Sequence, residues 1–234
     1  MEFEIHRADE RGRADHGWLK ANHSFSFASY YRPDRMRFGA LLVMNDDEIA
    51  PAMGFGTHPH DNMEIITVPL EGVVAHRDSM GHEGTVTAGE VQVMTAGTGV
   101  QHSEFNGSAT ALLRLFQLWI IPRERGLPPA YDQHEYARST GGFTVLAGPD
   151  GRDGSLRINQ DALVARGSFA AGSSGSWSVA FPGNGVYLMV VEGRVRINGE
   201  ELGRRDAAAI TAAEVVSFEA LEDADLLCVE VPMI

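Results

Sequence analysis

Four side chains in the sequence have types and spacings that suit a bound metal ion. His58 and His60 lie two residues apart in GTHPHDNMEIITVPLEG, and His102 and Glu104 lie two residues apart in TAGTGVQHSEFN. In a β-strand, side chains at positions i and i+2 point to the same face. Two such strands in one barrel can therefore bring three imidazoles and one carboxylate together.

Nitrogen and oxygen ligands of this kind suit Fe(II), Mn(II), Ni(II), Cu(II) or Zn(II). Cys228 is the only cysteine, which excludes a thiolate zinc site and an intrachain disulfide. Four ligands from one side of a barrel leave positions open for a substrate oxygen or for dioxygen. Burying a glutamate beside histidines is costly without a cation, so the set as a whole favours metal binding.

The elements that must position these ligands are predicted to be strands. Short apolar runs rich in valine and isoleucine recur along the chain, bounded by glycine, asparagine and aspartate. The 26 glycines suit the many turns that such strands require. Residues 155–167 are a weak helix candidate, or else a strand and a loop. Residues 122–142, rich in proline, glycine and charge, are predicted to be a linker.

An internal repeat divides the chain into two barrels. The sequence pattern of residues 64–76 is repeated at 186–197, and each copy has a Glu-Gly turn, at Gly72 and at Gly193. A repeat made of short strands and tight turns predicts two stacked small β-barrels in an all-β fold. We place the N-terminal barrel at 1–135 and the C-terminal barrel at 136–234.

The repeat also serves as an internal control on the candidate ligands. A purely structural need for these histidines would appear in both copies. Counting the same offsets in the second copy reaches Val179, Phe181, Phe218 and Ala220 in place of the four candidates. The first barrel is therefore predicted to hold the metal, and the second to be a degenerate barrel without one.

Composition limits the classes of partner. The chain has 234 residues, a net charge of -13 and a pI near 5.0. Nucleic acid and anionic membrane both require a basic surface, so neither is expected as the main partner. The charged N-terminus lacks the apolar core of a signal peptide, and no apolar run approaches the roughly 20 residues that span a bilayer. We expect a cytoplasmic protein.

Three motifs resemble the pirin family, the metal-binding bicupins: HPHDNME, EGVVAHRDSMG and TAGTGVQHSE. The segments DHGWLKANHSFSFASYY and MNDDEIAPAMGFGTHPH resemble the bacterial members, which include pirin-like quercetin 2,3-dioxygenases. The similarity is strong over the N-terminal two-thirds, and the last third matches in layout, most clearly at RDGSLRINQDA. The resemblance implies a bicupin, with two stacked double-stranded β-helix (jelly-roll) barrels in one chain.

The resemblance also implies a ligand set. In pirins the two histidines of HPH and the His and Glu of HSE hold the metal, which here are His58, His60, His102 and Glu104. Fe(II) is our first expectation, with Mn, Ni, Cu and Zn as alternatives. The general cupin motif has instead a glutamate just after its two histidines, where Glu64 stands here. Following the pirin pattern, we treat Glu64 only as a candidate partner of the ligands.

The function implied by the resemblance is cleavage of a flavonol such as quercetin by dioxygen, with release of carbon monoxide. Glu104 would then be both a ligand and the acceptor of the substrate's proton. The alternative is a non-enzymatic, metal-binding regulator that docks on a protein partner. A cupin acting on another small molecule is a third possibility. We expect a monomer, because a bicupin already pairs two barrels within one chain.

The other histidines are interpreted singly. We assign His76 a structural role, with a hydrogen bond across its hairpin. His82 and His134 are predicted to be at the surface. His23 precedes the first barrel, and for it the sequence leaves open both a place at the mouth of the site and plain packing.

Overall fold

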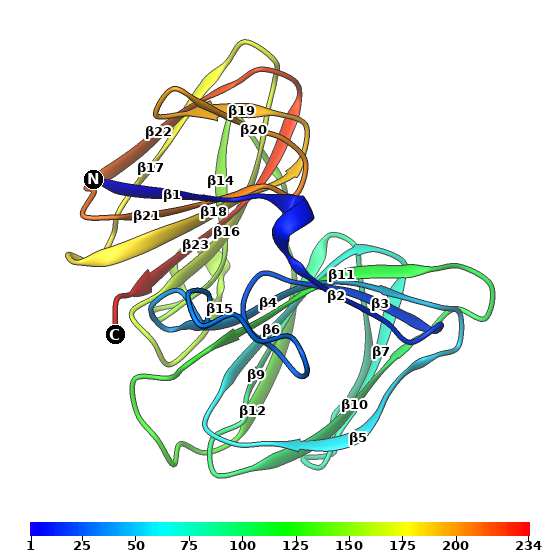
Figure 1. The fold of residues 1–234 in the computed structure, drawn as a ribbon. Helices are drawn as coiled ribbons and strands as arrows, with labels where there is room; N and C mark the ends of the chain where they lie inside the picture. Colours follow the sequence, from blue (N-terminus) through cyan, green and yellow to red (C-terminus); the bar gives the residue numbers. More distant parts are fainter.

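The structure is a computed structural model that describes residues 1–234 and consists almost entirely of strands. Its helical segments are two short 3-10 turns, η1 (Ala8–Glu10) and η2 (Arg152–Gly154). Two β-barrels are stacked against each other (Figure 1). The predicted all-β, two-barrel fold is confirmed.

The strands of the first half are β1 (Glu2–His6), β2 (Gly12–Asp15), β3 (Leu19–His23), β4 (Leu41–Ile49), β5 (Gly54–His60), β6 (Glu64–Glu71), β7 (Val73–Asp78), β8 (Glu83–Thr87), β9 (Glu90–Thr95), β10 (Val100–Asn106), β11 (Leu113–Ile120) and β12 (Ala130–Glu135). Those of the second half are β13 (Ser139–Thr140), β14 (Gly142–Gly148), β15 (Leu156–Arg157), β16 (Leu163–Phe169), β17 (Ser174–Ser178), β18 (Asn184–Glu192), β19 (Val195–Ile197), β20 (Glu200–Leu202), β21 (Ala207–Thr211), β22 (Val215–Ala220) and β23 (Ala224–Pro232).

Each barrel consists of one large and one small sheet, and the strand orders of the two barrels correspond. The first barrel has the sheets β12-β9-β6-β11-β4-β3-β2 and β5-β10-β7-β8. The second has β1-β21-β18-β23-β16-β14-β15, with β13 beside β16, and β17-β22-β19-β20. The repeat seen in the sequence is therefore a structural repeat, in which β6 and β7 correspond to β18 and β19.

The Glu-Gly turns of the two copies require glycine. Gly72 and Gly193 have φ values of 86° and 83°, in the left-handed region that side chains with a Cβ avoid. A Cβ on Gly72 would also lie 2.6 Å from the carbonyl oxygen of Leu112. The same conformational need explains why this dipeptide recurs in both copies.

Strand β1 lies in the second barrel, although it begins the chain. It pairs antiparallel with β21, from Glu2 opposite Thr211 to His6 opposite Ala207. It takes the edge position that β12 takes beside β9 in the first barrel. In Figure 1 the dark blue β1 lies in the upper barrel, and the chain then crosses through η1 to β2 and β3 in the lower one. The predicted first unit, 1–135, thus contains one strand that completes the sheet of the second.

Two local predictions differ from the structure. The linker prediction for 122–142 is wrong over Ala130–Glu135, because this segment forms β12 and pairs with β9. An edge strand pairs its backbone on only one side and therefore tolerates proline and charged residues. For this reason the composition of the segment did not distinguish an edge strand from a linker. The helix candidate at 155–167 is instead β15, a loop and the start of β16, which is the strand-and-loop alternative.

The largest core lies between the two barrels, where the two large sheets pack face to face. This cluster of 27 buried residues takes members from both halves, such as Ile66 and Phe116 from one and Tyr187 and Val229 from the other. Side chains alternate along each strand, so one face of each large sheet joins this core and the other lines its own barrel. In β6, Ile66 faces the second barrel and its neighbour Thr67 faces the interior of the first.

A buried ion cluster joins the halves at the same interface. The Asp46 carboxylate accepts hydrogen bonds from Arg11 at 3.3 Å and from Arg205 at 2.9 Å. The Arg205 guanidinium also lies 5.0 Å from the centre of the Phe116 ring. Removing the partly buried Asp46 carboxylate would leave two buried arginines without their partner, which is costly, so the cluster fixes how β4 sits against the second barrel.

His6, at the end of β1, is one of the buried histidines that make stability depend on pH. His6 is buried, with Nδ1 3.1 Å from the Tyr187 hydroxyl. Burial, followed by the charge of Arg35, lowers its pKa from 6.5 to about 4. As pH falls, the His6 imidazole is therefore protonated near pH 6.5 in the unfolded chain but only near pH 4 in the folded chain. Stability is lost as pH falls through this window, at up to about 1.4 kcal/mol per pH unit.

We expect His6→Phe to flatten this part of the curve. Urea unfolding of the metal-free protein at pH 7, 6 and 5 should show a smaller loss of unfolding free energy in the variant than in the wild type. The exposed His134 provides the control, and His134→Gln should leave the curve unchanged. Parallel curves for His6→Phe and wild type would contradict the assignment.

Candidate metal centre

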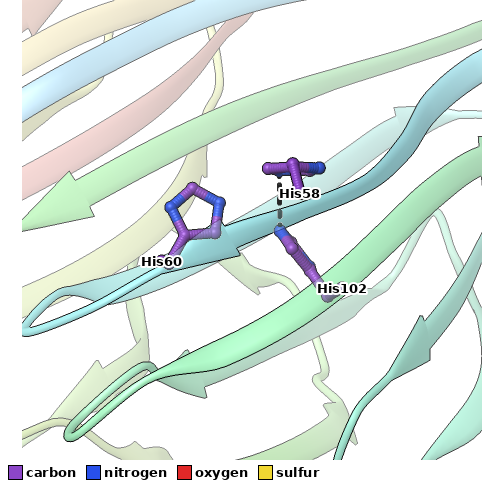
Figure 2. Close-up of side chains that lie close together, drawn as sticks. All are labelled: His58, His60 and His102. Atoms are coloured by element: carbon purple, nitrogen blue, oxygen red, sulfur yellow. Dashed lines mark hydrogen bonds between the residues drawn. The ribbon is translucent and has the colours of Figure 1, made fainter.

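Strands β5 and β10 pair so that His58 lies directly opposite His102. Their Nε2 atoms are 3.1 Å apart. The ring centres of the three histidines are separated by 4.5 Å for His58–His102, 4.8 Å for His58–His60 and 4.9 Å for His60–His102. Figure 2 shows His58 and His60 projecting from one strand toward His102 on its neighbour. The structure thus brings together the three histidines that the sequence singled out.

The donor set fits a metal ion. One nitrogen from each of His58, His60 and His102 lies within 4.8 Å of the others. The Nδ1 atom of His58 donates a hydrogen bond to the carbonyl oxygen of Gly56 at 2.8 Å, which leaves the lone pair of Nε2 facing His102. Fixing the ring tautomer by such a backbone contact is typical of metal-ligating histidines.

The protonation state of the cluster also suits a metal. Burial, followed by the neighbouring His58, lowers the pKa of His102 to about 3. Burial, followed by His102 and His58, lowers the pKa of His60 to about 4. Both imidazoles are therefore neutral near pH 7, with lone pairs available to a cation.

Glu104 lies beside this triad rather than within it. A register shift separates it from His102 in the pairing with β5, and its carboxylate groups with His102 and His76. It is buried and held by three donors: Thr67 Oγ1 at 3.0 Å, Gln92 Nε2 at 2.9 Å and Gln117 Nε2 at 2.7 Å. These contacts fix the carboxylate next to the histidines, and the four-ligand set remains a prediction.

His76 is closer to the site than its predicted structural role implies. It is buried on β7, opposite Glu104 of β10. Its Nε2 lies 3.3 Å from Asp78 in its own strand, so the predicted hydrogen bond across the hairpin is wrong. Its ring stacks on Tyr131 at 4.4 Å, and its Nδ1 has no hydrogen-bond partner.

Glu64 is not a partner of the ligands. It alternates with the inward-facing Thr67 and points to the interface between the barrels. There it accepts hydrogen bonds from Thr95 Oγ1 at 2.8 Å and Asn159 Nδ2 at 3.0 Å, and burial raises its pKa. The role considered for Glu64 around the metal ligands is therefore wrong, and the residue joins the two halves of the chain instead.

A cavity of about 200 Å³ opens beside the three histidines. Phe27, Phe55 and Trp119 form its aromatic walls. The remaining polar lining residues are His23, Asn45, Asp47, Glu104 and Gln117. His23 is buried there, with Nδ1 2.9 Å from Asn45 Oδ1, so the first of the two possibilities left open for it, a place at the site, is the observed one.

Five polar residues of the site were not predicted, but the sequence carries a signal for three of them. Thr67, Gln92 and Gln117 are polar residues at inward positions of largely apolar strands, whereas Asn45 and Asp47 belong to a polar run in β4. A buried polar group needs a partner, so such a residue indicates a polar network or a ligand within the barrel. Which of these alternatives applies depends on contacts between strands.

The interior of the second barrel has a different filling. The rings of Phe143, Phe169, Trp177 and Phe218 pack against one another there, with the centres of Phe169 and Phe218 4.8 Å apart. Phe218 stands on β22, the strand that corresponds to β10. Counted from the Glu-Gly turns, the strand pairing places Phe218 at the position of Glu104 and Val216 at that of His102, so the offsets counted in the sequence are shifted by two residues but the second copy still lacks both ligands.

Comparisons with known proteins agree with this architecture. A pirin family model matches residues 4–120, and a model of the quercetinase C-terminal cupin domain matches residues 145–231. A quercetin 2,3-dioxygenase of Escherichia coli (strain K12) is 45% identical over 228 residues, which are 97% of this chain and 98% of that protein. A pirin-like protein of Caulobacter vibrioides is 44% identical over 225 residues, which are 95% of this chain and 96% of that protein.

A solved structure extends the likeness to three dimensions. The crystal structure of the bacterial pirin YhhW from Escherichia coli in complex with nickel(II) has a TM-score of 0.94 and 43% sequence identity, and the match covers 100% of both chains. In the present structure, no helix has the length and apolar character needed to cross a membrane.

We expect His58→Ala to weaken binding of a divalent transition metal by more than about 100-fold, because loss of a ligand should exceed the 10- to 100-fold cost of losing a residue that only supports one. Isothermal titration calorimetry with Ni(II) at pH 7 measures this directly. His134→Ala, at an exposed position on β12, is the matched control. Equal affinity in both variants would exclude His58 as a ligand.

Proposed function

Because the chain belongs to the pirin family of two-barrel cupins and gathers three histidines at an aromatic-lined cavity, we propose that it is a metal-dependent dioxygenase. The proposed substrate is a flavonol such as quercetin, cleaved with release of carbon monoxide. The observation that carries the proposal is the opening of the histidine triad onto a cavity walled by Phe27, Phe55 and Trp119. Relatives named quercetin 2,3-dioxygenase support the substrate class.

The residues proposed to hold the metal are His58, His60, His102 and Glu104. Fe(II) is the first expectation for this nitrogen and oxygen set, and nickel(II) is the metal in the related YhhW complex. When bound, such a metal supplies a Lewis acid that favours the ionised form of a substrate hydroxyl. The chain's own residues must then bind the flavonol, take its proton and keep competing water away.

Glu104 is proposed to take the proton of the flavonol 3-hydroxyl. Its Oε1 accepts hydrogen bonds from Thr67 and Gln92, whereas Oε2 accepts one from Gln117. A carbonyl-type oxygen can accept two hydrogen bonds, so only Oε2 retains a free lone pair. Glu104 would therefore take the proton with the same lone pair that would hold the metal, and the two roles would alternate. The three donors hold the carboxylate in place while the proton arrives, as a positioned general base requires.

The overall reaction balances without another reactant. Both oxygen atoms of dioxygen enter the opened ring, and one ring carbon leaves as carbon monoxide, so no external reductant is needed. The aromatic walls suit the flat rings of a flavonol. The cavity is smaller than the range of about 300 to 1,000 Å³ usual for small-molecule sites. Only part of a three-ring flavonol therefore fits inside, and the remainder extends through the mouth.

We predict that Glu104→Gln keeps measurable metal binding but lowers kcat for quercetin by about 10²-fold or more, as expected for loss of a general base. Metal content by mass spectrometry and turnover by flavonol absorbance separate the two effects. The exposed Glu83 is the control, and Glu83→Gln should have wild-type kcat. Full turnover by Glu104→Gln would exclude the proton-accepting role.

The activity itself is tested by anaerobic reconstitution with Fe(II), and then with the other divalent metals, followed by quercetin and air. We expect metal-dependent loss of flavonol absorbance together with carbon monoxide, both abolished in His58→Ala. Tight metal binding without turnover under any metal would contradict the proposal. That outcome would favour the regulatory alternative, and a search for a protein partner would follow.

A further inference from the structure

Asp47 is a buried carboxyl group that the fold does not use. It lies on β4 with 5% of its surface exposed and lines the cavity beside the histidines. Its Oδ1 atom has no hydrogen-bond partner. The neighbouring Asp46 points the opposite way and accepts hydrogen bonds from Arg11 and Arg205. Asp47 has no such cation and forms no ion pair.

A second unpartnered polar group faces the same cavity. The Nε1 atom of Trp119 is buried without a hydrogen-bond partner, and its ring stands edge-on to His60 with the ring centres 4.9 Å apart. Leaving a buried donor and a buried acceptor unsatisfied is costly. Such groups persist in native proteins where function needs them, and these two lie in one aromatic-walled cavity.

The two buried carboxyl groups of the cavity, Glu104 and Asp47, differ in their hydrogen-bond partners. Glu104 accepts hydrogen bonds from three side chains, whereas Asp47 is left open to the cavity. Burial, followed by the charges of Asp46 and Glu104, raises the pKa of Asp47 to about 8. The unpartnered Oδ1 of Asp47 thus faces the cavity as a hydrogen-bond acceptor that a ligand can satisfy.

We propose that Asp47 binds a phenolic hydroxyl of the substrate and is the residue by which the cavity selects hydroxylated aromatic rings. A phenolic hydroxyl can donate a hydrogen bond, which matches the unpartnered Oδ1 of Asp47. The aromatic walls hold the ring, and Asp47 fixes its rotation relative to the histidines. This inference takes its substrate class from the proposed function, but its central contact can be tested without a flavonol.

The test compares wild type with Asp47→Leu, which is similar in size but has no polar atom. Glu48→Gln, at the adjacent position on the opposite face of β4, is the control. Affinities are measured by calorimetry on metal-loaded protein without oxygen, so that no turnover occurs. The ligands are quercetin, fisetin without the 5-hydroxyl, and galangin without the catechol hydroxyls, all of which keep the 3-hydroxyl assigned to Glu104.

We expect wild type and Glu48→Gln to bind at least one of the two analogues about tenfold more weakly than quercetin, because a missing hydroxyl leaves Asp47 unpaired. In Asp47→Leu that difference should disappear. Asp47→Asn retains a donor and an acceptor, should keep part of the preference, and provides a second variant if the leucine variant does not fold. Preferences unchanged in both variants would overturn the inference.

A pair of small probes separates this inference from the proposed function. Toluene has a methyl group where phenol has its hydroxyl, and the two are otherwise identical. Their binding is measured by ligand-observed NMR on the same proteins. We expect wild type to prefer phenol, and Asp47→Leu to lose that preference. If quercetin fails to bind while Asp47 still selects phenol, the flavonol assignment is wrong and the role of Asp47 stands. A phenol preference that survives Asp47→Leu would overturn the role of Asp47 whatever quercetin does.

Discussion

The face-to-face packing of the two large sheets is the interaction on which the rest of the structure depends. It forms the largest core of the molecule, and neither barrel could leave that apolar face in water. Because one face of each large sheet is committed to this core, strand alternation assigns every other residue to the barrel interior. The interior of the first barrel can then carry polar groups, since the stabilising apolar burial is provided largely on the other side of the sheet.

Within that interior, some buried polar groups have hydrogen-bond partners and others do not. Glu104 is surrounded by Thr67, Gln92 and Gln117, which satisfy its oxygens and fix its position. Asp47 has a buried oxygen without any such partner. The difference is physical: a satisfied carboxylate supports a fixed geometry, whereas an unsatisfied one remains available to a ligand. The same barrel thus contains both a rigid centre and an open contact.

The second barrel shows that this fold can be built without the histidine cluster. Its strand order repeats that of the first barrel, yet aromatic rings such as Phe169 and Phe218 fill its interior. The same topology therefore supports an apolar core in one copy and a histidine cluster in the other, as expected when function lies in side chains placed on a fold. The pairing of β1 with β21 and the contacts of Arg205 with Asp46 join the two copies into one unit.

Much of this arrangement could be predicted from the sequence. The alternation of apolar residues, the glycines and the repeated Glu-Gly turn determined an all-β chain of two barrels, because these patterns reflect local geometry. The i, i+2 spacing placed His58 with His60 on one face, and the second copy, which lacks all three histidines, indicated that they serve a function. The pirin resemblance then added a ligand set and a substrate class.

Only the tertiary structure decided which residues meet across strands. It set His58 opposite His102, turned Glu64 away to the interface, and brought His76 beside Glu104. It also made Ala130–Glu135 a strand and moved β1 into the second barrel. Register and pairing depend on partners distant in the chain, so local patterns do not encode them. For the same reason, the burial of Asp47 and the lack of a partner for its Oδ1 atom could be learned only from the fold.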